Sequence, residues 1–155
     1  MSLKDIPELY RIKRLFTVNQ YLTDALESLE IELEKHKAYI KYNYHFYGYG
    51  YWGIFEIKTN KLIGSCGLQN NEIDHNMETE LGYLLDPLYQ GKGFALECAQ
   101  YVLKYAKENL ALSRIAAVIH PDNRSSINLA KKLGLKKEKE ILHQGIMCEL
   151  FTITL

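Results

Sequence analysis

A glycine-containing segment, Gln90-Gly91-Lys92-Gly93-Phe94-Ala95, stands between an apolar run and an amphipathic one. Upstream, residues 80–85 read as a strand that Asp86-Pro87 ends, and downstream apolar residues recur every three to four positions from Phe94 to Asn109. That spacing predicts a helix with one buried face. The first amides of a helix have no internal partner, and the helix dipole makes that end weakly positive. Because glycines let a ligand come close to the backbone, the segment suits a phosphate or pyrophosphate.

Aromatic residues crowd into the fourteen positions from Tyr39 to Trp52, which hold six of the chain's twelve tyrosines together with Phe46 and Trp52. Ring faces of this kind can hold an aliphatic or cationic ligand. They can equally pack over a sheet or form a dimer contact, so both interpretations stay open. The five histidines, His36, His45, His75, His120 and His143, show no spacing typical of metal ligands, and we expect no metal.

The elements around these residues alternate between strands and helices. Helical periodicity covers 19–42, with Thr23 or Asp24 as a cap, and a second helix follows Asp122 or Asn123 and ends at Gly134. Residues 70–76 are polar and predict a loop. The predicted strands span Tyr10–Phe16, 51–58, 61–69, 78–86, 114–119, 135–143 and 145–155. This order predicts one α/β domain over residues 1–155 around a mixed sheet.

Composition narrows the class of protein. The 155 residues are 47% hydrophobic and 25% charged, which is typical of a single globular domain. The formal net charge is zero, which argues against a nucleic-acid partner. Cys66, Cys98 and Cys148 are far apart and odd in number, so we expect reduced thiols. We find no secretory signal and no apolar run of about 18 residues, and we expect a cytoplasmic protein without a membrane span.

Several motifs together resemble the GNAT N-acetyltransferases. Gln90-x-x-Gly93-x-Ala95 matches the family signature Gln/Arg-x-x-Gly-x-Gly/Ala, and Glu80-Leu81-Gly82-Tyr83 resembles its fourth strand. His120-Pro121-Asp122-Asn123-x-x-Ser126, followed by Lys132-Leu133-Gly134-Leu135, resembles the coenzyme-contacting helix and its end. The resemblance covers residues 50–155 well and the first 45 poorly. It is strongest to the Rim-type (RimJ/RimL-like) branch, whose members acetylate N-terminal amines of ribosomal proteins among other substrates.

The resemblance implies a fold and a cosubstrate. We expect a mostly antiparallel sheet of six to seven strands, splayed between the family's fourth and fifth strands and flanked by about four helices. Acetyl-coenzyme A would bind there, in a monomer or a homodimer. Backbone groups of Tyr83, Leu84 and Leu85 would pair with pantetheine. The pyrophosphate would lie on the loop and first helical turn, formed by Gln90, Gly91, Lys92, Gly93, Phe94, Ala95 and Leu96.

Two residues of the later helix have alternative roles. Asn123 resembles the family's coenzyme-contacting asparagine and is equally well placed to cap the helix. Ser126 would either reach the coenzyme or only occupy the first helical turn.

The implied reaction is attack of a neutral amine on the thioester, which a general base assists by removing a proton. Glu80 is the candidate base, and Glu78 shares its strand face. In several family members, however, the glutamate falls at the position of Thr79; either a bulge reconciles the two, or Glu80 is structural. The family's tyrosine acid would fall at Ala130 and another acid at Val118. Either Ser126, a water or a tyrosine from elsewhere would then protonate the thiolate, or catalysis would be slow.

Two functions of different classes follow from the resemblance. The first is an acetyl-coenzyme-A-dependent N-acetyltransferase acting on a primary amine, either a peptide or protein N-terminus or a small molecule. The second is a coenzyme-A-binding module that senses or scaffolds with little or no turnover. The aromatic segment would line the acceptor pocket in the first case.

Overall fold

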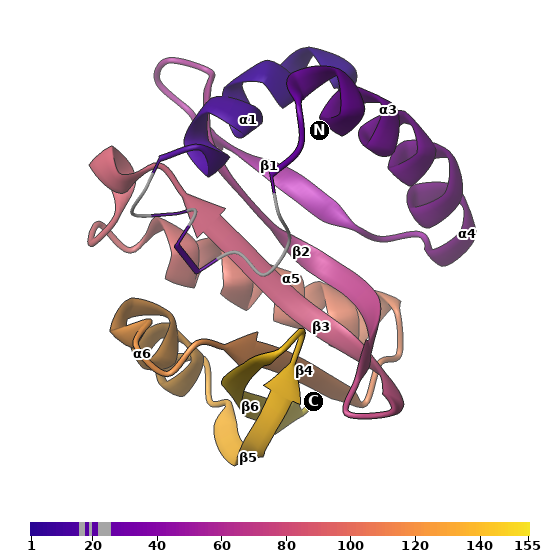
Figure 1. Cartoon of the computed structure of the whole chain (residues 1–155), viewed down its shortest axis with the longest axis vertical. Coiled ribbons are helices and arrows are strands. Elements are labelled where there is room, and N and C mark those ends of the chain that lie inside the picture. The colour runs from indigo at the N-terminus through magenta and orange to yellow at the C-terminus, as the bar shows by residue number, and fades with distance from the viewer. Residues whose placement is uncertain (16–17, 19, 22–25) are drawn as a thin grey trace.

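A six-stranded mixed sheet forms the centre of the computed structural model, which describes residues 1–15, 18, 20–21 and 26–155 (Figure 1). Within these residues the strand order is β1-β2-β3-β4-β6-β5, and only β3 and β4 pair in parallel. The expected mixed, mostly antiparallel sheet is therefore confirmed. The strands are β1 Tyr51–Glu56, β2 Lys61–Ile73, β3 Asn76–Leu85, β4 Arg114–Ile119, β5 Lys136–His143 and β6 Ile146–Thr154.

Helices cover both faces of this sheet (Figure 1). The longer ones are α1 Ile6–Lys13, α3 Leu29–Tyr39, α5 Phe94–Asn109 and α6 Arg124–Lys132. Short helical segments span Leu3–Asp5, Ile40–Tyr44, α4 His45–Tyr47 and Pro87–Tyr89. Alternation along the strands separates two cores: Leu62 and Leu84 pack with α1 and α3, whereas Ile63 and Leu85 pack in the main core with α5.

The second half of the chain folds as its periodicity predicts. Helix α5 has the predicted bounds and buries Ala99, Val102, Leu103 and Ala106 against the sheet. Strand β4 also has the predicted bounds. Helix α6 follows Asn123 and ends before Gly134, whose φ of +90° is the left-handed conformation that stops a helix. In this half of the chain the apolar spacing and the capping residues indicate the same element boundaries, and the structure has those boundaries.

The predicted strand over Tyr10–Phe16 is wrong, because α1 continues through Lys13. Ile6, Leu9 and Ile12 recur every three residues and are buried together on one side of that helix. Phe16 lies outside the described residues, as do the proposed caps Thr23 and Asp24 and the start of the predicted helix at Asn19. Helix α3 begins after Ser28, whose Oγ accepts a hydrogen bond from the Ile31 amide at 3.4 Å.

The predicted loop over 70–76 is also wrong. Strand β2 continues to Ile73 and β3 begins at Asn76, so that only a tight turn at Asp74 and His75 separates them. Both turn residues have positive φ, +48° and +65°. The strand could not be recognised in this polar segment because few apolar residues mark its alternation. Ile73, which is 1% exposed, is the apolar residue that is buried there.

The three cysteine thiols are all free. Burial raises the pKa of the Cys66 thiol to about 12, so this side chain is a neutral core residue at ordinary pH. Among the described residues, no helix combines the length and the apolar character needed to cross a membrane.

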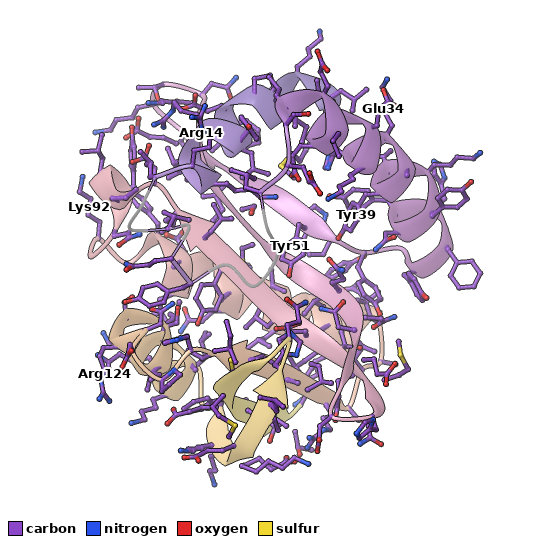
Figure 2. The ribbon with its side chains drawn as sticks, in the orientation of Figure 1. Arg14, Glu34, Tyr39, Tyr51, Lys92 and Arg124 are labelled. Atoms are coloured by element: carbon purple, nitrogen blue, oxygen red, sulfur yellow. The ribbon has the colours of Figure 1, made fainter. Side chains whose placement is uncertain are left out.

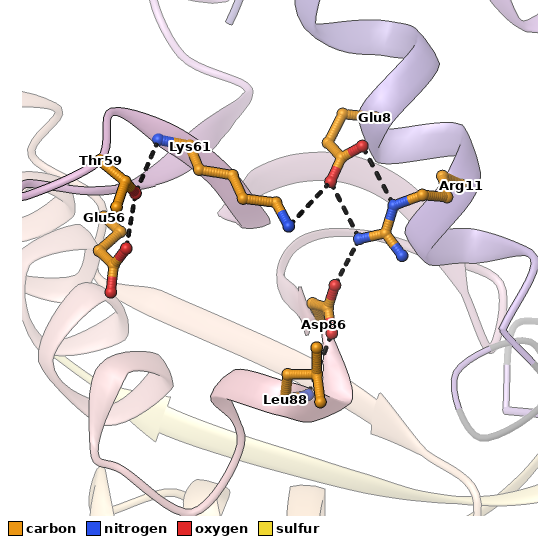
Figure 3. A network of polar contacts seen from close by, with 7 residues as sticks. All are labelled: Glu8, Arg11, Glu56, Thr59, Lys61, Asp86 and Leu88. Atoms are coloured by element: carbon orange, nitrogen blue, oxygen red, sulfur yellow. Dashed lines mark hydrogen bonds and ion pairs between the residues drawn. The ribbon is translucent and has the colours of Figure 1, made fainter.

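A polar network fastens α1 to the corner where β3 ends (Figure 3). Arg11 forms an ion pair with Asp86, whose residue is 1% exposed, and donates two hydrogen bonds to Glu8 at 2.9 and 3.1 Å. Asp86 Oδ1 also accepts the Leu88 amide at 3.0 Å, and its own amide donates to the Ile63 carbonyl. Burial alone would raise the pKa of Asp86, but hydrogen bonds from Arg11 and Leu88 outweigh it, and the pKa lies below its ordinary value.

Replacing Arg11 by methionine is expected to lower the free energy of unfolding by about 2 kcal/mol, because it leaves a buried carboxylate without its cation. The loss is smaller than for a fully buried pair, since the Arg11 side chain is 44% exposed. Urea denaturation of both proteins measures it. The control is Lys37→Met, which breaks the exposed Lys37–Glu34 pair and should cost at most about 0.5 kcal/mol. Equal losses in the two variants would contradict the account.

The Arg11–Asp86 ion pair also predicts how stability depends on pH. Because the folded-state pKa of Asp86 lies below its unfolded value of about 3.9, its contribution is fully present above that pH. The contribution is lost as the pH falls further, through the folded-state pKa. The stability difference between the unsubstituted protein and Arg11→Met should therefore be constant near neutral pH and shrink below pH of about 4. A difference that is unchanged in acid would show that Asp86 is not the group responsible.

Candidate functional site

The sheet opens between β3 and β4. Their parallel register consists of one pair, Glu80 with Ala116, after which β3 continues for five residues. On its other side the same segment stays paired with β2, where Tyr83, Leu84 and Leu85 lie opposite Cys66, Ser65 and Gly64. One edge of β3 beyond the Glu80 pair thus faces a wedge rather than a neighbouring strand, which is the expected splay. This edge can accept an extended ligand as an added strand.

The wedge leads to the glycine loop at the start of α5. Gly91 and Gly93 have φ of +73° and +89°, a conformation that L side chains rarely adopt. A Cβ at either glycine would meet no heavy atom within 4 Å, so the space above both is open. The amides of Phe94, Ala95 and Leu96 form the first helical turn, where backbone donors have no partner within the helix. This arrangement suits an anionic group, as the sequence predicted.

Side chains of the loop fix it to the sheet and leave a cation exposed. Gln90 Nε2 donates to the Leu85 carbonyl at 3.1 Å. The Leu85 carbonyl, which was expected to pair with pantetheine, therefore already accepts a hydrogen bond within the chain. Lys92 is exposed, with its ammonium 5.3 Å from the centre of the Tyr89 ring. Gln90 of the motif thus has a structural role, and the exposed Lys92 can approach an anion.

A cavity of about 690 Å³ lies on the α1 and α3 side of the sheet. Helices α1 and α3 form one wall, strands β2 and β3 form the other, and Val118 of β4 and the β5–β6 turn close one end. Its charged wall residue Glu32 pairs with Lys13 at 3.2 Å and with Lys35 at 3.8 Å. The cavity meets the wedge at Glu80, Gly82, Tyr83 and Leu84.

Glu80 lies where the two strands part, with its carboxylate held from both sides. Asn71 Nδ2 of β2 donates to Oε2 at 2.6 Å, and the Val118 amide of β4 donates to Oε1 at 3.4 Å. Asn71 is itself held by Gln69, whose Nε2 donates to Asn71 Oδ1 at 3.1 Å. The candidate base is therefore a positioned cavity carboxylate rather than a freely solvated one.

The register of β3 excludes the bulge that would have reconciled Thr79 with Glu80. The pairing with β2 runs without a shift from Asn76 to Leu85, so no bulge exchanges the two side chains. Thr79 points to the opposite face, where its hydroxyl donates to Asn70 Oδ1 at 2.9 Å. Glu78 does share the face of Glu80, as alternation requires, but its carboxylate is bound by Arg114 at 3.1 Å. Of these three residues, Glu80 alone lines the cavity.

Asn123 and Ser126 lie across the wedge from β3. Asn123 Oδ1 accepts the Ser126 amide at 3.1 Å and the Ser125 hydroxyl at 2.9 Å, so the helix-capping role is confirmed. Tyr83 spans the gap, and its hydroxyl donates to the Ser126 carbonyl at 3.1 Å. Burial raises the pKa of Tyr83 to about 12, which keeps this phenol neutral. The first turn of α6 is thereby fixed beside the strand that would hold the coenzyme.

The two positions at which the family carries an acid hold none here. Ala130 is 1% exposed and belongs to the main core beneath α6. Val118 lines the cavity with an apolar side chain and presents its amide to Glu80. Any proton donor to a leaving group must come from another residue or from water.

The aromatic segment divides between cavity, core and surface. Tyr39 and Tyr51 line the cavity (Figure 2), with ring centres 6.4 Å apart in a stacked arrangement. Tyr49 is buried in the main core, where its hydroxyl donates to Asn70 Oδ1 at 2.8 Å. Tyr42, Phe46 and Tyr47 are exposed. The segment thus contains residues that line the cavity and residues that pack in the core or lie on the surface.

Sequence reasoning missed part of the cavity wall. His36 and His143 line it, whereas His120 accepts the Asp122 amide beside the cavity and His45 is exposed. Asn71 was missed because the polar end of β2 resembled a loop, whereas Gln69 ended the predicted strand 61–69 and was not singled out. The alternation of Gln69, Asn71 and the buried Ile73 was the available signal. Within the described part of the chain, no three His, Cys, Asp or Glu side chains are grouped as a metal site requires.

Known proteins share both sequence and fold with this chain. Residues 1–136 match the family model described as the acetyltransferase (GNAT) domain. An uncharacterized N-acetyltransferase, p20, of Bacillus licheniformis is 42% identical over 82 residues, which are 52% of this chain and 45% of that protein. The [ribosomal protein uS5]-alanine N-acetyltransferase of Escherichia coli K12 is 30% identical over 88 residues, 57% of this chain and 45% of that protein. The chain spans about half the length of the curated relatives it matches.

A solved structure confirms the fold independently of close sequence similarity. The spermidine N-acetyltransferase of Vibrio cholerae, solved in complex with CoA and spermine, superposes with a TM-score of 0.79 at 19% identity. The superposition covers 99% of this chain and 92% of that one. At this identity the likeness establishes the fold alone. With the family model spanning most of the chain, the parted strands and the glycine loop belong to a protein of the GNAT acetyltransferase family.

Proposed function

We propose that this protein is an acetyl-coenzyme-A-dependent N-acetyltransferase that acetylates a primary amine, and that residues 1–155 form its catalytic domain. The observation that carries the proposal is the wedge between β3 and β4, which joins the open glycine loop at one end to the Glu80 cavity at the other. The donor and the acceptor can therefore reach one point from opposite sides. The solved spermidine acetyltransferase supports this use of the fold, since it was crystallised with CoA and spermine.

The chain's residues fit the donor in three places. Open space above Gly91 and Gly93 and the first-turn amides of α5 would hold the pyrophosphate, with Lys92 as a nearby cation. The edge of β3 at Tyr83 and Leu84 would pair with the pantetheine amides. Across the wedge, Asn123 and Ser126 would contact the coenzyme from the first turn of α6.

Glu80 would act on the acceptor. An α-amine with a pKa of about 8 is roughly one-tenth neutral at pH 7, whereas a lysine-type amine with a pKa of about 10.4 is well under 0.1% neutral. A base is therefore needed most for the second class. Hydrogen bonds from Asn71 and Val118 hold the Glu80 carboxylate at the end of the wedge, where it would accept the amine proton directly or through a water.

The competing function is a coenzyme-A-binding module without turnover, and the absence of an acid at Ala130 and Val118 is what favours it. Calorimetric titration with acetyl-coenzyme A, beside a thiol-release assay with spermidine and with an alanine-initiated peptide, separates the two. Binding together with thiol release establishes the transferase and selects an acceptor class. Binding without release on any acceptor would favour the module, and no binding would overturn the proposed site.

Glu80→Gln is expected to lower turnover about 100-fold or more and to leave the affinity for acetyl-coenzyme A unchanged. Glutamine keeps an oxygen for the Asn71 hydrogen bond, so the local structure should persist. The matched control is Glu78→Gln, on the same face but bound to Arg114, which should retain turnover. Steady-state kinetics over a range of pH measures both variants. A Glu80→Gln protein with unchanged activity at every pH would remove Glu80 from the mechanism.

Gly93→Trp is expected to weaken acetyl-coenzyme A binding at least about tenfold, or about 1.4 kcal/mol, because the indole would fill the open space above the loop. The left-handed φ itself costs about 1–2 kcal/mol for an L-residue. Gly48→Trp controls for that strain, since Gly48 also has positive φ (+74°) and open space but ends α4, away from the loop. Calorimetry and thermal unfolding of both variants test this. Normal affinity in a folded Gly93→Trp protein would refute the loop's role.

A further inference from the structure

Tyr51 extends from the edge of the sheet across its middle (Figure 2). It belongs to β1, opposite Gly67 of β2, and Gly67 in turn lies opposite Gly82 of β3. A Cβ built on Gly82 would be 2.2 Å from the Tyr51 hydroxyl oxygen and 2.7 Å from its ring. The hydroxyl of a β1 residue therefore lies directly above the backbone of β3, two strands away.

Two glycines in register make this placement possible. At Gly67 a Cβ would be 2.1 Å from the Gly50 carbonyl oxygen and 2.6 Å from Tyr51 Cα, so no side chain fits beneath the start of Tyr51. At Gly82 a Cβ would overlap the end of the ring. Neither glycine has positive φ, and the reason for glycine here is space. Glycine at these two positions leaves room for Tyr51 to extend from β1 past β2 to the backbone of β3.

The backbone of Tyr51 is fixed as firmly as its ring. The Tyr51 amide donates to the Tyr39 hydroxyl at 2.9 Å, and the Tyr44 hydroxyl donates to the Tyr51 carbonyl. Both bonds satisfy groups on the outer edge of β1, and Tyr39 also stacks on the Tyr51 ring. Tyr51 is thus fixed by hydrogen bonds to its backbone, by the stacked Tyr39 ring and by close approach to Gly82. A side chain in a functional site needs this kind of support.

The hydroxyl lies near the closed end of the wedge. The β3–β4 pair at Glu80 and Ala116 closes it, so an extended ligand that enters from the glycine loop cannot pass beyond Glu80. Gly82 is two residues short of that point, about 7 Å along the strand. A thioester at the tip of such a ligand would therefore lie close to Gly82, with Glu80 on one side and the Tyr51 hydroxyl above.

We propose, on the basis of the proposed function, that Tyr51 is a catalytic residue that donates a proton to the departing thiolate. The amine nitrogen forms a bond to the thioester carbonyl carbon, and the carbon–sulfur bond breaks with its electron pair on sulfur. The Tyr51 O–H proton passes to that sulfur, and the proton lost by the nitrogen passes to Glu80. Transfer from Glu80 to the Tyr51 phenolate, through water, restores both groups, so that one amine and one thioester give one amide and one thiol.

Three other tyrosine hydroxyls of the cavity are directed to groups other than the β3 backbone at Gly82. The Tyr83 hydroxyl is directed to the Ser126 carbonyl, and that of Tyr39 accepts the Tyr51 amide. The hydroxyl of Tyr21 contacts the Asp122 carbonyl at 3.5 Å, away from β3. Tyr51 thus fills the role that Ala130 and Val118 cannot perform.

The test is Tyr51→Phe, which removes only the oxygen and keeps the ring over Gly82. With acetyl-coenzyme A as donor, and spermidine or an alanine-initiated peptide as acceptor, kcat should fall at least about tenfold while calorimetric affinity for the donor is unchanged. This is less than the 10²–10⁴ typical of acid–base groups, because a thiolate with a pKa of about 8.5 leaves readily. The fall in kcat at alkaline pH that accompanies ionisation of the phenol should be absent from the variant.

The matched control is Tyr49→Phe, whose hydroxyl lies on the opposite face and bonds Asn70, which still has Thr79 as a partner. Its kcat and pH profile should match those of the unsubstituted protein. Equal kcat and pH profiles for Tyr51→Phe and the unsubstituted protein would overturn the role of Tyr51 alone. No thiol release by the unsubstituted protein with either acceptor would overturn the proposed function, and the role of Tyr51 with it.

Discussion

The site depends on one place in the sheet, where the parallel strands β3 and β4 pair at Glu80 and Ala116 and then separate. A continuous sheet would satisfy the backbone of β3 on both sides and leave no position for an extended ligand. Side-chain contacts lie along the open edge: Tyr83 of β3 reaches across to the Ser126 carbonyl, and Gln90 of the loop binds the Leu85 carbonyl. The open edge is therefore a fixed feature of the fold, held at both of its borders.

The two ends of this wedge are built by different parts of the chain. At the loop end, α1 contributes Arg11 to the buried Asp86, so the N-terminal helix determines where the glycine loop begins. At the closed end, β2 contributes Asn71, β4 contributes the Val118 amide and β1 contributes Tyr51, all around Glu80 and Gly82. Packing and chemistry are thus coupled, because contacts that fasten α1 and the aromatic segment to the sheet also shape the cavity.

The elements that the sequence predicts correctly are those with strong local signals. Helix α5, strand β4 and helix α6 have regular apolar spacing and capping residues, and their bounds follow from these. Strand β2 beyond Gln69 is polar, so its alternation was hidden, and Asn71 was missed with it. The last four residues of α1 were predicted as part of a strand because the buried Ile6, Leu9 and Ile12 give only a short helical pattern. The sequence alone does not show why Gly67 and Gly82 are glycines, because the reason depends on the strand register and on the position of Tyr51.

Hydrogen exchange with and without coenzyme A shows whether the wedge and the loop form one ligand site. Amides in the segments 83–85 and 91–96 should become protected together when coenzyme A is added, because pantetheine would cover the first and pyrophosphate the second. Amides of α3, which lies on the cavity wall opposite β3, should exchange at an unchanged rate. Protection confined to other segments, or no change in either segment at saturating coenzyme A, would contradict the account.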